Sequence, residues 1–222
     1  MLLGFEGLPG AGKSTQAGKL AGFLTGRGLI VNYLPDNLTR DADPLGRALL
    51  TLFDSGDPFS RHDNVITDTL LGAAIRADTY ATDIAGPLAD GVTVIEDRGI
   101  HTLYSYSLAR LLQQHHVAPA DAIAWLYQVG SFAGCPATRS VWLYLPADEA
   151  IARAESRQGH PYTDEQRAFL RFVHDAYAAL ADADTSLHVI DVTGLNPDET
   201  HRAVLGDLSS LPELAMKLAT AA

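Results

Sequence analysis

Short apolar runs alternate with longer amphipathic stretches along the whole chain. Five of the runs are rich in β-branched or aromatic residues and short enough to be strands buried on both faces of a sheet. They lie at residues 2–5, 29–34, 92–95, 141–145 and 187–192. Strands that alternate with helices form parallel sheets covered on both faces. The pattern therefore predicts an α/β fold with a doubly wound five-stranded parallel sheet flanked by helices.

The stretches between these runs have the periodicity of helices. One predicted helix begins at Lys13 and ends near Gly26, because its apolar residues recur at helical spacing and glycines are typical of helix ends. A long helical stretch covers residues 63–89. Its predicted buried stripe consists of Val65, Leu70, Ala73, Ala74 and Ala81.

A further helix is predicted after Tyr162. Thr163 and Gln166 have the spacing of a capping box, in which each side chain bonds the backbone N–H of the other residue. Apolar residues then recur at helical spacing, and we expect them to face the core. They are Phe169, Val173, Ala176, Tyr177 and Leu180.

Length and composition limit the domain organisation. The chain has 222 residues, 47% of them hydrophobic, and no proline-rich or glycine-serine linker divides it. A chain of this length buries about 70% of its unfolded surface, so it needs no disulfide or metal to stabilise its core. The one cysteine, Cys135, excludes an internal disulfide and a cysteine-based zinc site. We expect a single domain over residues 1–222.

The charge balance narrows the class of partner. Lys and Arg number 16 against 27 Asp and Glu, which gives a net charge of −11. Nucleic acid polymers and anionic membranes need a basic face, so neither is an expected partner. The longest uncharged run, residues 122–138, is too short and too polar to span a bilayer, and no signal peptide is visible. We expect a cytoplasmic protein that acts on small molecules.

Residues 7–14, GLPGAGKS, fit the phosphate-binding pattern G-x-x-x-x-G-K-[ST] completely. They follow the first predicted strand and open the first predicted helix, as the chemistry requires. Glycines let backbone N–H groups surround phosphate oxygens, and the helix N-terminus points its positive end at them. Lys13 adds a charge for the β- and γ-phosphates, and Ser14 can ligate Mg²⁺. The predicted ATP-binding residues are Gly7, Gly10, Ala11, Gly12, Lys13, Ser14 and Thr15.

A second candidate site follows the strand at residues 92–95. Ligands of doubly wound sheets bind at the carboxyl ends of strands. Asp97 is therefore predicted to lie near the phosphate loop and to hold the metal ion through water. Arg98 is predicted to clamp a second phosphate, because its planar fork suits bidentate anion binding.

Residues 153–164 have the features of a short lid. Arg153 and Arg157 share one face of a predicted helix, and a glycine and a proline follow. Such arginines can close over a transferring phosphoryl group and stabilise its charge, so both are candidate catalytic residues with Lys13 and Arg98. In the alternative, they form weak surface ion pairs with Glu149 and Asp164.

These segments, in this order, resemble the thymidylate kinase family of nucleoside monophosphate kinases over most of the chain. The resemblance implies a P-loop kinase fold, ATP as co-substrate, Mg²⁺ as cofactor and a homodimer. It rests on residues 5–7 and 15–16 around the phosphate loop, on LLGAAIR at 70–76, on the D-R-x-x-x-S-x-x-x-Y spacing from Asp97 to Tyr106, on 146–153 and on 169–177.

By this resemblance, Arg76 contacts the base, Arg98 the acceptor phosphate and Tyr106 the deoxyribose. Three departures lie on the acceptor side. Pro9 stands where the family usually has a carboxylate, and Gly72 where a phenylalanine stacks on thymine. Residues 33–36, YLPD, replace the usual Arg-Glu-Pro-Gly, which makes Asp36 a candidate acceptor contact. Tyr80 or Tyr104 can fill the space at Gly72.

The resulting hypothesis is phosphoryl transfer from Mg·ATP to a nucleoside monophosphate, with dTMP or a modified or related nucleotide as acceptor. A second hypothesis is a nucleoside or small-metabolite kinase that phosphorylates a hydroxyl group. It needs a carboxylate near that hydroxyl, and Asp36, Glu96 and Asp97 are the candidates. A third hypothesis is a non-catalytic nucleotide-binding switch or scaffold.

Overall fold

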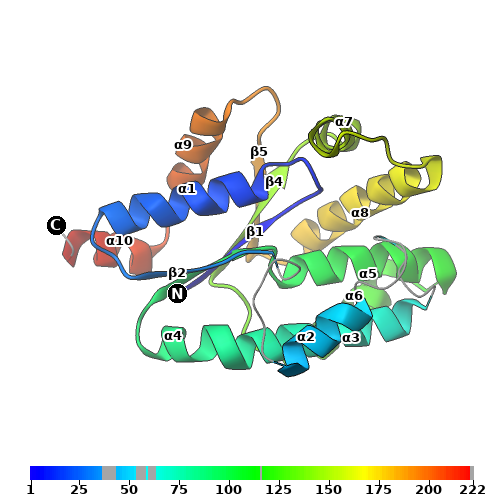
Figure 1. Cartoon of the computed structure of the whole chain (residues 1–222), viewed down its shortest axis with the longest axis horizontal. Helices are drawn as coiled ribbons and strands as arrows, with labels where there is room; N and C mark the ends of the chain where they lie inside the picture. The colour runs from blue at the N-terminus through cyan, green and yellow to red at the C-terminus, as the bar shows by residue number, and fades with distance from the viewer. Residues whose placement is uncertain (37–43, 54–58, 60–63, 116, 221–222) are drawn as a thin grey trace.

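A computed structural model of the chain describes residues 1–36, 44–53, 59, 64–115 and 117–220. Within them a five-stranded parallel sheet carries helices on both faces, which confirms the predicted α/β class (Figure 1). All five predicted strands form, in the order β2-β3-β1-β4-β5. Their bounds are β1 Leu2–Glu6, β2 Val31–Leu34, β3 Thr93–Asp97, β4 Arg139–Tyr144 and β5 Leu187–Asp191.

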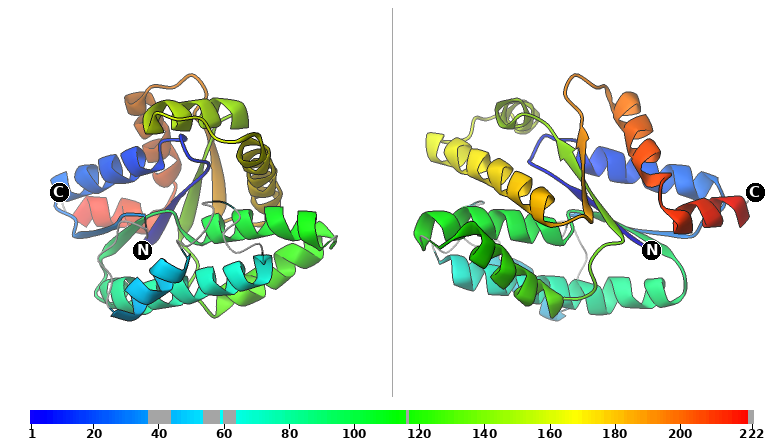
Figure 2. Two further views of the ribbon diagram at one scale, coloured as in Figure 1. Left: turned by 45° about the vertical axis from the view of Figure 1, so that its right-hand side comes forward. Right: turned by 180° about the vertical axis from the view of Figure 1, so that it is seen from behind.

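Helices cover the sheet from two sides. α1, α9 and α10 lie on one side, and α3, α5 and α8 lie on the other (Figure 2). None of the described helices combines the length and the apolar character that crossing a bilayer requires. The bounds are α1 Lys13–Gly26, α2 Pro44–Phe53, α3 Val65–Thr79, α4 Ala85–Ala89, α5 Ile100–Gln114, α6 Pro119–Ser131, α7 Ala147–Gln158, α8 Asp164–Ala183, α9 Pro197–Leu208 and α10 Pro212–Thr220.

Three predicted helical stretches are confirmed in detail. α1 has the predicted bounds. The stretch at 63–89 consists of α3 and α4, joined by a π-helical turn at Tyr80–Ile84. α8 begins with the predicted capping box, in which the Thr163 hydroxyl accepts from the Gln166 backbone N–H at 3.2 Å and the side-chain Oε1 of Gln166 accepts from the Thr163 backbone N–H at 3.0 Å.

The predicted apolar stripe of the 63–89 stretch is wrong at three positions. Leu70, Ala74 and Ala81 are exposed. The buried face of α3 includes Val65 and Ala73, but it also carries polar and charged side chains. Hydrophobic periodicity misplaces this face because Asp68, Thr69, Arg76 and Thr79 are buried on it.

The central strands bring two loops together. β1 and β3 are buried along their whole length, whereas β2 is a partly exposed edge strand. β1 pairs with β3 in parallel, with Phe5 opposite Asp97. The segments that follow the two strands, at residues 7–12 and 98–99, therefore lie side by side at the same edge of the sheet.

Glu6, the last residue of β1, links this edge of the sheet to neighbouring helices through hydrogen bonds. Its side chain is fully buried. One carboxylate oxygen accepts hydrogen bonds from the backbone N–H groups of Gly99 (3.0 Å) and His101 (3.1 Å) at the start of α5. The other accepts from the hydroxyls of Thr102 (2.6 Å) and Tyr177 (3.1 Å). A single carboxylate thus links β1, α5 and α8.

We predict that Glu6→Gln lowers the free energy of unfolding by about 2–3 kcal/mol, because an amide –NH₂ then faces donors that now share a charged acceptor. Urea denaturation followed by circular dichroism measures the change. Glu149→Gln is the matched control. Its carboxylate is exposed in an i,i+4 pair with Arg153, so a loss below about 0.5 kcal/mol is expected. Equal losses in the two variants contradict the role given to Glu6.

Candidate active site

The phosphate-binding loop joins β1 to α1. Gly10 has a positive φ of 89°, a conformation that favours glycine. A Cβ at this position would lie 2.1 Å from the carbonyl oxygen of Ala150 in α7. The loop therefore tolerates no side chain at Gly10, because the backbone of α7 packs directly against it.

Lys13 is enclosed by this loop. The side chain is buried, and its Nζ donates to the carbonyl oxygen of Leu8 at 2.9 Å. Burial and the nearby Arg98 guanidinium lower the pKa of Lys13 well below its ordinary value, although Asp97 and Glu6 act in the opposite direction. A cation held this way gains from any anion that enters the loop.

The end of β3 places a carboxylate and a guanidinium beside Lys13. Asp97 is 4% exposed, and its Oδ1 has no hydrogen-bond partner among the described residues. Arg98 has a positive φ of 73°, which is uncommon for a residue with a side chain. Its backbone N–H donates to the carbonyl oxygen of Phe5 at 3.1 Å, which holds this turn against β1.

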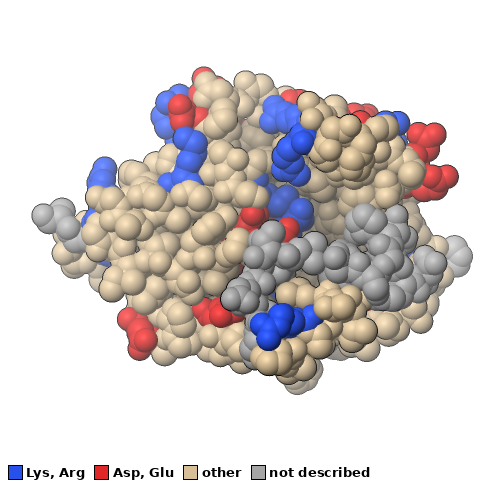
Figure 3. All heavy atoms as spheres, in the orientation of Figure 1, with Lys and Arg blue, Asp and Glu red and all other residues tan. Residues whose placement is uncertain are grey.

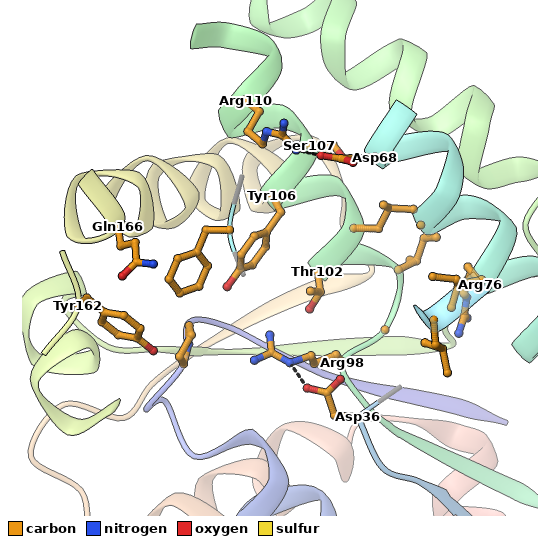
Figure 4. A pocket seen from close by; sticks show the side chains of 18 of the residues that line it. Asp36, Asp68, Arg76, Arg98, Thr102, Tyr106, Ser107, Arg110, Tyr162 and Gln166 are labelled. Carbon is orange, nitrogen blue, oxygen red and sulfur yellow. Dashed lines mark hydrogen bonds and ion pairs between the residues drawn. The ribbon is translucent and has the colours of Figure 1, made fainter. Parts of the chain in front are cut away.

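Arg98 is oriented by a residue from the neighbouring strand. Its Nε donates to Oδ2 of Asp36, just beyond β2, at 2.6 Å (Figure 4). Burial by itself lowers the pKa of Arg98, but its interactions with Tyr106, Asp36 and Tyr177 outweigh burial and raise the pKa above its ordinary value. Arg98 is therefore a permanent cation in the site.

A cavity of about 550 Å³ opens between the phosphate loop, α3, α5 and the segment after α7. Among the described residues, four arginines line it: Arg76, Arg98, Arg110 and Arg157. On the face shown in Figure 3, Lys and Arg atoms gather around the central hollow, although the whole chain has a net charge of −11. The cavity suits a small anionic ligand.

Aromatic rings form another part of the cavity wall. Phe59, Tyr106 and Tyr162 line it, and the Phe59 ring centroid lies 6.5 Å from that of Tyr106 and 5.3 Å from that of Tyr162. Tyr80 and Tyr104 are not in this wall. Tyr104 packs against the ring of Tyr127 at 5.1 Å instead. The expectation that one of these two tyrosines fills the space at Gly72 is therefore wrong.

Arg76 lies in the cavity wall on α3, where it is 7% exposed and forms a buried ion pair with Glu96. Its Nη2 has no hydrogen-bond partner among the described residues. Burial raises the pKa of Glu96, and Arg76 opposes that rise. The predicted base-contacting arginine thus reaches the cavity, with one side of its guanidinium held by a carboxylate.

The two arginines predicted for the lid are in different environments. Both are exposed, but Arg153 forms an ion pair with Glu149 at 2.6 Å, which is the surface pairing considered as the alternative. Arg157 lines the cavity, and the structure gives it no ion pair among the described residues. Asp164, the expected partner of Arg157, pairs with Arg167 at 3.4 Å. The structure thus separates Arg157 from Arg153.

Glu155 fastens the segment between α7 and α8. Its Oε1 accepts from the backbone N–H of Tyr162 at 2.9 Å and from Nε of Arg167 at 2.8 Å. The hydrogen bond from Arg167 lowers the pKa of the Glu155 carboxyl, and that from Tyr162 adds to the effect. These bonds place His160 and Tyr162 at the cavity.

Sequence reasoning did not find Glu6 or the buried pair of Asp68 and Arg110, which lines the far end of the cavity. Arg110 lies one helical turn after Tyr106, a spacing that places both on one face of α5. That spacing was the available signal. Nothing local indicates that Asp68 is its partner 42 residues away.

Comparison with known proteins adds independent evidence. The family model for thymidylate kinase matches residues 5–204. A thymidylate kinase of Synechococcus sp. (strain WH7803) is 31% identical over 206 residues, which cover 90% of each chain. One of Synechococcus sp. (strain JA-2-3B'a(2-13)) is 30% identical over 230 residues, which cover 100% of this chain and 98% of the relative. With the phosphate loop and the site already in place, the chain belongs to the thymidylate kinase family of ATP-dependent nucleoside monophosphate kinases.

Proposed function

We propose that the protein transfers the γ-phosphoryl group of ATP to a deoxynucleoside monophosphate, with thymidylate or a related nucleotide as acceptor. The observation that carries the proposal is the pairing of β1 with β3, which sets the Lys13 loop beside Arg98 at one edge of the sheet. Two anion-binding groups at one cavity suit two phosphate-bearing substrates. The relatives' name, thymidylate kinase, supports the choice of acceptor.

On the donor side, the loop N–H groups and the N-terminus of α1 bind the ATP phosphates. Lys13 exchanges its bond to the Leu8 carbonyl oxygen for the β- and γ-phosphates. Ser14 and Asp97 are proposed to hold Mg²⁺, the latter through water, and the unpartnered buried Oδ1 of Asp97 fits that role. When bound, Mg²⁺ neutralises charge on the phosphates during transfer.

On the acceptor side, Arg98 binds the monophosphate. Asp36 accepts from Nε of Arg98, and we propose that the other N–H groups of this guanidinium bind the phosphate. Asp36 also supplies a carboxylate near the loop position at which Pro9 replaces the family's usual one. Tyr106 contacts the sugar and Arg76 the base.

The acceptor phosphate oxygen is already anionic, so transfer needs no strong general base. What it needs is charge stabilisation and exclusion of water. We propose that residues 153–164 act as a lid, and that Arg157 is the lid arginine that stabilises the transferring group because it already lines the cavity.

Phosphorylation of a hydroxyl is the weaker alternative, because two of its three candidate carboxylates are occupied. Asp36 is engaged by Arg98, and Glu96 by Arg76. Asp97 is then the remaining candidate for a general base at the acceptor hydroxyl, and it is also proposed to hold Mg²⁺. The non-catalytic scaffold remains the outcome to be expected if no acceptor stimulates ADP formation.

The homodimer stays a prediction of the family resemblance. We propose that a second copy covers the outer face of α3, because Leu70 is 51% exposed there and Ala74 lies on the same face one turn later. An apolar side chain of this size gains from burial against a like surface.

Lys13→Ala is expected to lower kcat by about 10²–10³-fold or more, because it removes a fixed cation from the transferring phosphate. A coupled ADP-release assay measures the loss, and circular dichroism checks that the variant folds. Lys19→Ala is the control, since Lys19 lies on the same helix and pairs with Asp198. Unchanged turnover in Lys13→Ala refutes the proposed function.

Arg98→Ala is expected to raise KM for a nucleoside monophosphate by roughly 10- to 150-fold, because the variant loses charge-assisted hydrogen bonds to the phosphate. KM for ATP should change far less. Arg171→Ala serves as the control, because Arg171 is exposed and pairs with Asp148. If Arg98→Ala leaves KM for the monophosphate unchanged, the acceptor carries no phosphate at this site.

Arg157→Ala is expected to lower kcat by about 10²-fold or more, as removal of a transition-state donor does. Arg153→Ala is a control on the same helix, since Arg153 pairs with Glu149 outside the cavity. We expect it to change kcat by less than about threefold. Steady-state kinetics at saturating substrates measure kcat for both variants. A larger loss of kcat in Arg153→Ala would show that Arg153, and not Arg157, stabilises the transferring group.

A further inference from the structure

Tyr162 brings a hydroxyl group to the cavity from the segment between α7 and α8. Its side chain is partly buried and lines the cavity. In Figure 4 its hydroxyl end points toward the guanidinium group of Arg98, and the hydroxyl end of Tyr106 does the same from α5. Two tyrosine hydroxyls therefore approach the arginine proposed for the acceptor phosphate from different elements of the fold.

The two hydroxyls differ in their partners. The hydroxyl of Tyr106 forms a hydrogen bond with Arg98. The hydroxyl of Tyr162 has no hydrogen-bond partner among the described residues, because the hydrogen bond of Tyr162 is made by its backbone N–H. A phenolic hydroxyl can both donate and accept. Tyr162 therefore has a donor available for a ligand in the cavity.

The charges around Tyr162 suit an anionic ligand. Burial raises the pKa of Tyr162, while the positive charges of Arg157 and Arg98 act in the opposite direction. The resulting pKa lies above the ordinary value, so the hydroxyl keeps its proton at neutral pH and can donate a hydrogen bond. Both guanidinium groups act on this one hydroxyl. It is therefore near the arginine proposed for the acceptor phosphate and near the one proposed for the transferring group.

Two contacts fix the position of Tyr162. The rings of Phe59 and Tyr162 meet edge to face, with their centroids 5.3 Å apart and their planes at 65°. The backbone N–H of Tyr162 donates to Oε1 of Glu155 at 2.9 Å, and the same oxygen accepts from Nε of Arg167 at 2.8 Å. Glu155 belongs to α7 and Arg167 to α8, so this carboxylate links the two helices that flank Tyr162. A donor positioned before the ligand arrives loses less conformational entropy on binding.

We propose that the Tyr162 hydroxyl donates a hydrogen bond to the phosphate of the acceptor nucleotide at Arg98, and that Glu155 is the residue that positions it. The inference rests on the proposed function, because it requires the acceptor phosphate to lie at Arg98. A neutral donor suits this place, since it binds the anion without adding another positive charge beside Arg98 and Arg157, which repel each other. Tyr162 then recognises the phosphorylated form of the acceptor and not the nucleoside.

Tyr162→Phe tests the contact, because it removes the hydroxyl and keeps the ring that packs against Phe59. Titration calorimetry measures the Kd of thymidylate and of thymidine, which lacks the phosphate. We expect the variant to bind thymidylate roughly 10- to 100-fold more weakly, the range for a hydrogen bond to a charged group, and to bind thymidine with unchanged affinity. Equal weakening for both ligands makes the hydroxyl structural and overturns the proposal, and so does unchanged binding of thymidylate.

Tyr127→Phe is the matched control. It also removes a hydroxyl, but this hydroxyl donates to Asp184 at 3.4 Å and Tyr127 does not line the cavity. We expect the ratio of the two dissociation constants to stay at its wild-type value in this variant. Circular dichroism checks that both tyrosine variants fold.

A double-mutant cycle tests the positioning role of Glu155. Glu155→Ala removes the acceptor that holds the Tyr162 backbone, so it should weaken the binding of thymidylate by no more than Tyr162→Phe does. The double variant should bind thymidylate as Tyr162→Phe alone does, because the hydroxyl is already absent. Glu149→Ala, on the same helix and paired with Arg153, should leave the affinity unchanged. If the two losses add, Glu155 does not act through Tyr162 and its positioning role is wrong.

A failure of this inference can be told from a failure of the proposed function. If no monophosphate stimulates ADP formation, the proposed function fails, and the calorimetric comparison still decides whether Tyr162 binds the phosphate. If thymidylate is phosphorylated and Tyr162→Phe binds it as the wild-type protein does, only the role of Tyr162 is wrong. A wild-type protein that binds thymidylate no more tightly than thymidine also overturns the inference, because no phosphate is then recognised at Arg98.

Discussion

One buried carboxylate sets the geometry on which the site depends. Glu6 ends the strand that leads into the phosphate loop, and it accepts four hydrogen bonds from the start of α5 and from Tyr177. Since Gly99 is among the donors, the backbone next to Arg98 is fixed relative to the loop that holds Lys13. A buried charge with this many donors is stable where an isolated one is not. The phosphate-binding loop and the turn at Arg98 are therefore parts of one rigid unit.

Three of the four arginines that line the cavity, among the described residues, are paired with carboxylates. Arg98 is held by Asp36, Arg76 by Glu96 and Arg110 by Asp68. Each carboxylate engages part of its guanidinium. This arrangement explains how an acidic chain concentrates positive charge at one place, because most of its acidic residues lie outside the cavity while three of them orient arginines in its wall.

The departures from the usual family pattern are concentrated on the side of the site that we propose for the acceptor. Pro9 removes a carboxylate from the loop, and Asp36 supplies one beside Arg98. Gly72 removes a ring, and the cavity beyond it ends at Arg110. The donor side keeps the complete phosphate-binding motif. The residues that bind the donor phosphates in the family are therefore retained, while those at the proposed acceptor side differ.

Local sequence determined the strands, α1, the capping box of α8 and the phosphate loop, because each depends on residues a few positions apart: apolar runs, helical spacing, side chains that cap a helix, and glycines that free the backbone. The parallel sheet followed from the alternation of strands and helices. Only the tertiary structure decided which face of α3 is buried, which of Arg153 and Arg157 lines the cavity and which carboxylate pairs with each arginine. The partners of Arg76, Arg98 and Arg110 lie 20, 62 and 42 residues away in sequence. Such pairs form when tertiary packing buries side chains that are far apart in the sequence. Local sequence patterns therefore do not predict them.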